Sequence, residues 1–193
     1  MAIQPRRFVL DTSLFVNPHA REKFGKNPSA AVKGFIKLIK KLGGGDFFIP
    51  PSIFKELRNF IGEKEAHELD LYIKKRAPNT YALYLPAAVL NDFIEDVRNR
   101  LNKGLRLAEE FAQDNRPEND EKLKRLRDKY RDAVRTGLVD SKEDFDLLLL
   151  AKELEATLVS SDEGVLKFAD KLGCEWLNAS KFYDLLKKML RTR

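Results

Sequence analysis

The chain has 193 residues, of which 36 are Lys or Arg and 30 are Asp or Glu, so its formal net charge is +6 at pH 7. This length is enough for one domain, or for one domain with a sizeable insertion, whose core needs no disulfides. The single cysteine excludes an intramolecular disulfide framework and a cysteine-built zinc site. With only two histidines as well, the composition indicates a soluble, basic protein whose chemistry depends on carboxylates.

The sequence contains no candidate membrane segment, because a spanning helix needs about 20 predominantly apolar residues. The apolar run after the basic N-terminus is only Phe8-Val9-Leu10 before Asp11, which is too short for the core of a signal peptide. With a single thiol in addition, we expect a cytoplasmic protein that makes no membrane contact.

Short apolar strands alternate with amphipathic helices in the first part of the chain. Strands are predicted at 8–10 and 47–49, and helices at 29–42 and from 52 to about 61, because apolar residues recur there at helical spacing. Ser52 is the expected N-cap of the second helix. This alternation is typical of an α/β fold with a mostly parallel sheet.

The middle of the chain is predicted to form two long helices, at 92–112 and at about 120–135, separated by an Asn- and Pro-containing loop at 115–119. Such a pair forms an αα-hairpin. We therefore expect a helical insertion at 91–135 within an α/β domain formed by 1–90 and 136–193. Its second helix is rich in both signs of charge, which suits either an ordinary solvated face or an arm that contacts phosphate or another subunit.

Alternation returns after the insertion. A very apolar helix is predicted from Phe145 to Leu154, followed by a strand at 157–160, a helix at 166–172 and a strand at 174–177. The tail from Lys181 to Arg193 is predicted to be a basic helix.

Carboxylates follow the predicted strands. Asp11 and Asp162 come just after two of them, and ligands of an open α/β sheet bind beyond the carboxyl ends of its strands. Further acids are predicted on helix starts: Glu56, Asp140, Asp144 and Asp146. Two carboxylates 4 Å apart repel by about 4 kcal/mol at an effective dielectric of 20, and a divalent cation removes that cost. Alternatively, Asp144 and Asp162 only complement helix N-termini.

Four segments resemble, in order, the motifs of PIN-domain nucleases. They are Phe8–Ser13, Ile49–Leu57, Asp144–Asp146 with the leucines after it, and Thr157–Asp162. The resemblance covers residues 8–62 and 138–178. It implies a PIN-like α/β fold in which the metal ligands are Asp11, Glu56, Asp144 and Asp162. It also implies auxiliary catalytic acids at Asp140 and Asp146, and a role for Thr12 or Ser13 in orienting Asp11 or a phosphate. Glu56 departs from the broader pattern if this branch keeps it off the metal.

The length, the insertion and the spacing of the later aspartates are similar to those of the minimal protein-only ribonuclease P, the HARP type. In that family, a PIN domain with a projecting helical pair forms a large homo-oligomer and removes the 5′ leader of precursor tRNA without an RNA subunit. The resemblance implies a Mg²⁺ or Mn²⁺ cofactor. The expected reaction is attack of a metal-activated water on phosphorus, which gives a 5′-phosphate and a 3′-hydroxyl.

Basic residues of the second insertion helix are the expected RNA ligands, since arginines four positions apart share a helix face. They are Arg125, Arg127, Lys129, Arg131 and Arg135. The insertion's apolar stripes predict burial against a second copy of the chain. Two alternatives remain open: a different PIN-type endoribonuclease, such as a toxin that cuts tRNA or rRNA, and a non-enzymatic RNA-binding protein.

Overall fold

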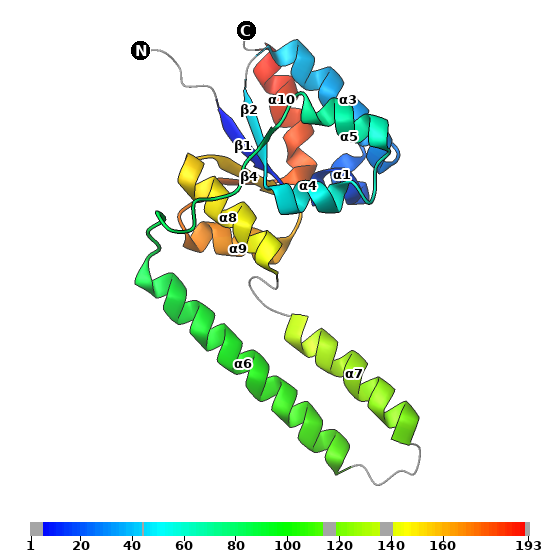
Figure 1. Ribbon diagram of the computed structural model, residues 1–193, viewed down its shortest axis with the longest axis vertical. Helices are drawn as coiled ribbons and strands as arrows, with labels where there is room; N and C mark the ends of the chain where they lie inside the picture. The colour runs from blue at the N-terminus through cyan, green and yellow to red at the C-terminus, as the bar shows by residue number, and fades with distance from the viewer. Residues whose placement is uncertain (1–5, 44, 114–118, 136–140, 192–193) are drawn as a thin grey trace. The chain divides into compact units, whose positions relative to one another are not determined.

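The computed structural model describes residues 6–43, 45–113, 119–135 and 141–191, with the backbone alone at 134 and 135. The chain divides into two compact units. Unit 1 comprises Met1–Tyr84 with Ser141–Arg193, and unit 2 comprises Leu85–Asp140. Unit 1 contains the sheet and unit 2 contains a pair of helices (Figure 1).

Unit 1 is built on a parallel sheet of five strands in the order β3-β2-β1-β4-β5. The strands are β1 (Arg7–Leu10), β2 (Asp46–Ile49), β3 (Lys74–Lys75), β4 (Thr157–Ser160) and β5 (Trp176–Asn178). The chain adds β2 to one side of β1 and β4 to the other, so the strand order reverses at β1. The α/β prediction is confirmed, and such a switch point is where open sheets bind ligands.

Helices cover both faces of this sheet (Figure 1). On one face, α3 (Pro28–Leu42) and α10 (Phe182–Arg191) pack together over an aromatic cluster in which Phe8 contacts Phe47 and Phe182. On the other, α8 (Lys142–Leu154) packs on β1 and β4, while α9 (Glu163–Lys171) packs on β4 and β5. Burial of apolar side chains from both faces accounts for the near-continuous hydrophobic runs of the central strands.

Shorter helices complete unit 1: α1 (Ser13–Val16), α2 (Pro18–Arg21), α4 (Pro51–Leu57), α5 (Glu63–Asp70) and the 3₁₀ turn η1 (Ala179–Lys181). The prediction for α4 was wrong at both ends. Pro50 precedes the first helical residue and Pro51 occupies it, because a proline lacks the N–H that this position leaves unpaired. Ser52 is therefore inside the first turn, and Ile61 lies beyond the helix end.

Strand β5 begins two residues later than predicted. Leu172 is the C-cap of α9, and the N–H of Cys174 donates to the carbonyl of Ala169. The backbone of Cys174 therefore still belongs to the turn that closes the helix. Gly173 adopts a positive φ of 66° in the same turn, a conformation that glycine adopts without the cost imposed on other residues.

Unit 2 consists of α6 (Ala87–Ala112) packed along α7 (Asn119–Arg135). The two predicted helices are present, although α6 begins five residues before the predicted start, directly after Pro86. The helices approach closely at Gly104, where an added Cβ would lie 2.6 Å from the Tyr130 ring. Much of the predicted loop at 115–119 lies outside the described residues. No helix in the described ranges is long and apolar enough to span a membrane.

Candidate active site

The site begins at Asp11, the residue that follows β1. Its carboxylate is buried, and its Oδ2 atom accepts hydrogen bonds from the hydroxyls of Ser13 at 2.5 Å and Ser160 at 2.6 Å. Ser160 is the last residue of β4, and the pairing of β1 with β4 aligns it with the start of the Asp11 segment. The hydroxyls of Ser13 and Ser160, which are far apart in the sequence, thus hold the Asp11 carboxylate at the switch point.

Burial raises the pKa of the Asp11 carboxyl group above its ordinary value, because the charged form loses its hydration. Hydrogen bonds from Ser13 and Ser160 oppose this shift, whereas the negative charge of Asp162 adds to it. The ionised form of Asp11 is therefore costly in this place, and a nearby cation would stabilise it.

Asp162 faces the same end of the sheet and also caps α9. Its Oδ1 atom accepts hydrogen bonds from the N–H groups of Gly164 at 2.7 Å and Val165 at 3.0 Å. Its own N–H donates to the Ser160 hydroxyl at 3.0 Å. The cap expected as an alternative role is thus present, but it occupies only one carboxylate oxygen.

Glu56 reaches the end of β1 from α4. The Thr12 hydroxyl donates to Glu56 Oε2 at 3.1 Å, so this exposed acid is tied to the residue directly after Asp11. Of the two orienting residues suggested by the resemblance, Ser13 contacts Asp11 and Thr12 contacts Glu56 instead. Ser13 Oγ also accepts the Ser161 N–H at 2.8 Å, which joins the segments after β1 and β4.

Helix α8 presents two further acids at its start. Ser141 is its N-cap and accepts the N–H of Asp144 at 3.0 Å, while the Ser141 hydroxyl donates to Asp144 Oδ2 at 2.7 Å. Two residues further along, Asp146 Oδ2 accepts a long hydrogen bond of 3.4 Å from the hydroxyl of Ser52 in α4. Asp140 lies outside the described residues.

These contacts bring Asp11, Glu56, Asp146 and Asp162 to the carboxyl edge, meaning the edge of the sheet formed by the carboxyl ends of its strands. Within the described ranges, however, no three Asp, Glu, His or Cys side chains lie close enough to hold a metal ion. Asp11 and Asp162 are linked as a pair through Ser160. The acids therefore border one edge without forming a closed ligand set there.

The sequence matches the family described as PINc domain ribonuclease over residues 7–191. It is 46% identical over 188 residues to RNA-free ribonuclease P of Pyrococcus furiosus, covering 95% of this chain and 94% of that protein. It is 46% identical over 184 residues to the protein of that name from Thermodesulfovibrio yellowstonii, covering 94% and 93% of the two chains. This chain belongs to the RNA-free ribonuclease P family. The Halorhodospira halophila member is 42% identical over 181 residues, which cover 90% of this chain and 85% of that protein.

Family membership confirms the predicted resemblance to PIN nucleases and to protein-only ribonuclease P. It also favours a ribonuclease over the non-enzymatic alternative. The match runs through the whole of α6 and α7 as well as the sheet.

The predicted RNA ligands of α7 are exposed in unit 2 where their side chains are described. Lys129 turns towards α6, where its Nζ lies 3.6 Å from Glu110 and 5.3 Å from the Phe111 ring centre. Arg131 lies 3.9 Å from Asp128, and Arg127 shares its helix face because the two are four positions apart. Arg125 is also exposed, and the side chain of Arg135 lies outside the described residues.

Sequence reasoning missed three hydroxyl groups of the site: those of Ser52, Ser141 and Ser160. Ser160 had a usable signal, because a polar residue ending an apolar strand must find a partner when it is buried. Ser141 also had one, since Ser followed three residues later by an acid typifies a helix start. The contact from Ser52 to Asp146 joins residues 94 positions apart, so no local sequence pattern could predict it.

Proposed function

We propose that this protein removes the 5′ leader of precursor tRNA by metal-dependent hydrolysis of one phosphodiester bond, without an RNA subunit. The observation that carries the proposal is identity of 46% along 95% of the chain to RNA-free ribonuclease P, joined to a buried aspartate at the sheet's switch point. Such a substrate accords with the cytoplasmic location expected from the single thiol.

The donor chemistry at the carboxyl edge fits a divalent cation, as PIN nucleases generally require. Carboxylate oxygens are the ligands that hard cations such as Mg²⁺ prefer, and Mn²⁺ suits the same donors. The hydroxyl donors of Asp11 occupy its Oδ2, and the cap of α9 occupies Oδ1 of Asp162. We propose that Asp11, Asp162, Asp144 and Glu56 would hold the ion, with Asp140 and Asp146 as auxiliary acids. When bound, the ion would polarise the scissile phosphate and lower the pKa of a water molecule.

The chain's own part in this reaction is to hold its carboxylates in place. Each described acid of the site accepts a hydroxyl or amide hydrogen bond from a nearby residue, for example Asp11 from Ser160 and Glu56 from Thr12. Fixed side chains need no reorganisation when charge develops on the phosphate. The expected products are a 5′-phosphate on the tRNA and a 3′-hydroxyl on the leader.

The α6–α7 hairpin supplies the remaining parts of the proposal. Its basic side chains, Arg125, Arg127, Lys129, Arg131 and Arg135, are proposed to bind phosphates of the tRNA body. An exposed apolar stripe on α6 comprises Phe93 (44% exposed), Val97 (36%), Leu101 (62%) and Leu105 (59%). An apolar surface of this kind indicates a protein contact, and we propose that a second copy of the chain covers it in a homo-oligomer.

The decisive experiment uses 5′-labelled precursor tRNA with Mg²⁺, the wild-type protein and the Asp11→Asn variant. A single leader-sized product from the wild type alone, with a 5′-phosphate on the mature tRNA, is the expected result. Asp170→Asn is the matched control, since Asp170 is an exposed acid at the opposite end of α9 from Asp162. Cuts within tRNA or rRNA loops, without leader removal, would instead support a toxin-like PIN endoribonuclease.

A further inference from the structure

Helix α3 exposes a row of lysines. Its exposed lysines, Lys33, Lys37, Lys40 and Lys41, recur at intervals of four, three and one. The residues between them, apart from Gly34, are buried apolar side chains, and Phe35 among them joins the aromatic cluster through Phe47 and Phe182. Four-residue steps are about 6 Å apart along a helix axis, so Lys33, Lys37 and Lys41 form a regularly spaced line of positive charge. The helix contains no acidic residue.

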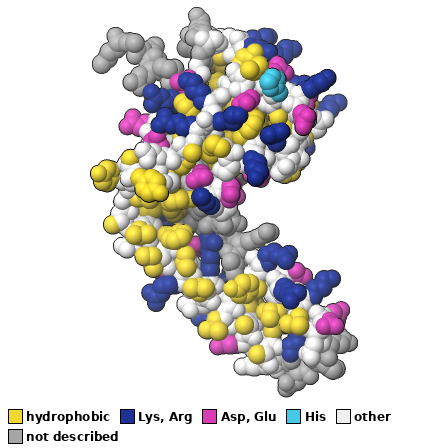
Figure 2. Space-filling model, viewed as in Figure 1, with side chains coloured by type: hydrophobic (Ala, Val, Ile, Leu, Met, Phe, Trp, Pro, Cys, Tyr) yellow, Lys and Arg dark blue, Asp and Glu magenta, His cyan; other side chains and the backbone are white. Residues whose placement is uncertain are grey.

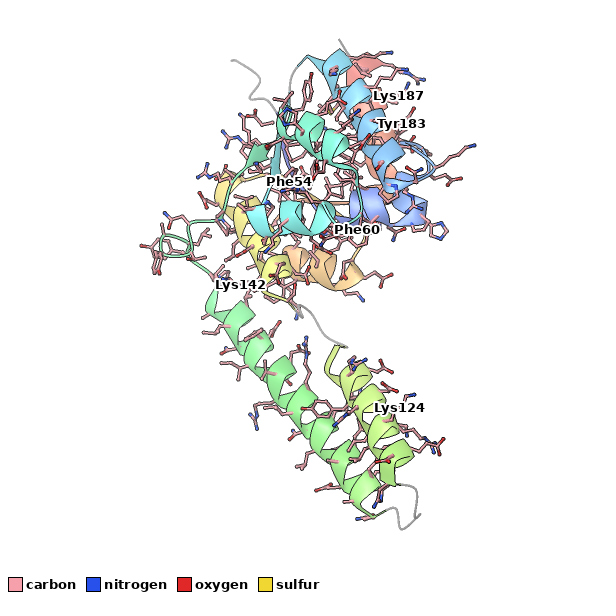
Figure 3. All side chains as sticks on the ribbon, turned by 45° about the vertical axis from the view of Figure 1, so that its right-hand side comes forward. Phe54, Phe60, Lys124, Lys142, Tyr183 and Lys187 are labelled. Carbon is pink, nitrogen blue, oxygen red and sulfur yellow. The ribbon has the colours of Figure 1, made fainter. Side chains whose placement is uncertain are left out.

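Helix α10 packs beside α3 and is basic on its outer side as well. Phe182 and Leu186 are buried, whereas Lys187, Lys188 and Arg191 are exposed, as is Lys181 of η1 directly before the helix. Lys187 lies over the Tyr183 ring, 5.7 Å from its centre, and Figure 3 shows both residues beside α3. Figure 2 shows dark-blue side chains gathered over the upper part of unit 1, where these helices lie.

The segment between α2 and α3 joins the two helices into one surface. Phe24 packs edge-on against Tyr183 of α10 and also against Phe35 of α3. Lys23 lies 2.6 Å from Asp184, which ties the same segment to α10. We define the basic face as the exposed bases of these three parts of unit 1. They are Lys23, Lys26, Lys33, Lys37, Lys40, Lys41, Lys181, Lys187, Lys188 and Arg191.

Few acids balance these charges. Lys33 and Lys40 pair with Glu65 and Glu68 of α5, and Lys23 pairs with Asp184. Exposed pairs of this kind contribute at most about 1 kcal/mol to stability. Helix α3 contains no acid and α10 contains Asp184 alone, so positive charge predominates on this part of unit 1.

We propose that the basic face is a second RNA-binding surface, which contacts the phosphates of a helical part of precursor tRNA away from the scissile bond. This inference rests on the proposed function. Helices of a parallel α/β sheet run back from the carboxyl edge, and α3 is about 22 Å long, so its lysines extend the positive charge away from the acids. A duplex held at the carboxyl edge would lie along such a line.

The kind of side chain on the basic face indicates its ligand. Nearly all the bases are lysines, compact point charges that contact phosphate without the planar fork with which arginine reads base edges. Single-stranded RNA would need exposed aromatic rings for stacking, and a membrane surface would need exposed apolar side chains for insertion. Among the described residues, α3 and α10 expose no large hydrophobic side chain of either kind.

The test compares two double variants of the full chain. Lys37→Glu/Lys187→Glu reverses two charges of the basic face. Lys167→Glu/Lys171→Glu reverses two on α9, a helix outside the basic face that also contains Glu163, which pairs with Lys167, and Asp170. Neither pair belongs to the proposed catalytic or hairpin machinery. For the first variant we expect the Kd of precursor tRNA to rise at least about tenfold, and the slope of log K against log salt to fall by about 2. The cleavage rate at saturating RNA should stay unchanged.

Separate measurements of binding and cleavage distinguish failure of this inference from failure of the proposed function. Leader cleavage with an unchanged Kd and salt slope in Lys37→Glu/Lys187→Glu would overturn the basic face alone. Weakened binding of a plain RNA duplex, without leader cleavage by the wild type, would support the face and overturn the function. If Lys37→Glu/Lys187→Glu lost the binding to phosphatidylglycerol vesicles that the wild type shows, but bound RNA as the wild type does, RNA would be overturned as the ligand. Lys37→Gln/Lys187→Gln removes the charges without adding acids, and it replaces the charge-reversed variant if that variant does not fold. Lys37→Arg/Lys187→Arg keeps the charges and should bind precursor tRNA with the affinity of the wild type.

Discussion

At the scale of single residues, Asp11 shows a conflict between stability and function. Burial raises the pKa of its carboxyl group, and the charge of Asp162 raises it further. The folded state therefore favours the protonated form, whereas a metal ligand must be ionised. Ser13 and Ser160 lower the pKa and so keep the ionised form within reach.

The variant Asp11→Asn should separate these two effects. The folded pKa of Asp11 lies above the unfolded value of about 3.9. Its stabilising contribution is therefore fully present below that pH and is lost as pH rises through the raised pKa. We expect the melting temperature of Asp11→Asn, relative to wild type in EDTA, to increase as pH rises above about 4. Cleavage should fall at least about a hundredfold.

An unchanged difference in melting temperature between pH 4 and pH 8 would contradict this account of Asp11. The variant Asp170→Asn is the control, because Asp170 is exposed and its carboxylate is not subject to the same burial. Its melting temperature should follow that of the wild type throughout.

Ser141 has two roles that a matched substitution can distinguish. It caps α8 and it donates to Asp144 Oδ2, whereas Asn27 caps α3 through Ala30 alone. Ser141→Ala and Asn27→Ala should each lower the free energy of unfolding by about 1 kcal/mol, measured with urea. Only Ser141→Ala should also lower kcat, because it releases a proposed metal ligand. Equal kcat values in the two variants would show that Ser141 is no more than a cap.

At the scale of elements, long periodic patterns predicted structure well. The helices α3, α6 and α7 follow from apolar residues at helical spacing, and β1, β2 and β4 from short apolar runs. The two-residue strand β3 and the four-residue helices α1 and α2 are too short to show a period. They form because tertiary contacts hold them, as when Thr12, just before α1, binds Glu56 of α4.

The candidate site divides in the same way. Asp11 and Asp162 were predictable because they follow strands, and the topology then explains why they are neighbours. The hydroxyl contacts were not predictable, because Ser160 and Asp11 are 149 positions apart in the sequence. The local sequence does not indicate such a contact, because it forms only when the strands of the sheet pair.

Gly104 controls how closely α6 and α7 approach. A Cβ there would lie 2.6 Å from Tyr130 Cε2, so Gly104→Val should cost about 1–3 kcal/mol through overpacking. Asn102→Val is the control, because it adds the same β-branched side chain at an exposed position of α6. The melting temperature, followed by the helical signal, should fall more for Gly104→Val than for Asn102→Val. Adding Tyr130→Ala to Gly104→Val should restore it. Identical melting of the two valine variants would contradict a close contact.

At the scale of the whole molecule, the net charge of +6 conceals a separation of the two signs. The acids of the site gather at the carboxyl edge, while bases predominate on α7 and on the basic face. An anionic polymer is thus attracted to α7 and to the basic face, whereas the carboxylates of the proposed site repel it. A bound cation would remove that local repulsion.

The proposed oligomer can be tested with two leucines of similar exposure. Leu101 of the α6 stripe is 62% exposed and Leu71 of unit 1 is 69% exposed. Leu101→Asp should lower the mass measured by light scattering, because it places a charge in the proposed interface, whereas Leu71→Asp should not. A wild-type mass of 22.2 kDa at micromolar concentrations, corresponding to one chain, would contradict self-association.

The pairing of β1 with β4 also determines when the enzyme can become active. Asp11 receives its buried setting only when Ser160 and the Val159 carbonyl reach it, and long-range strand pairing of this kind forms late. The contacts between α6 and α7 are local, and both helices are synthesised before β4. During translation the hairpin can therefore fold while the nuclease site is still incomplete. From the proposed site we expect a nascent chain to cut RNA only after Ser160 and Asp162 have left the ribosome.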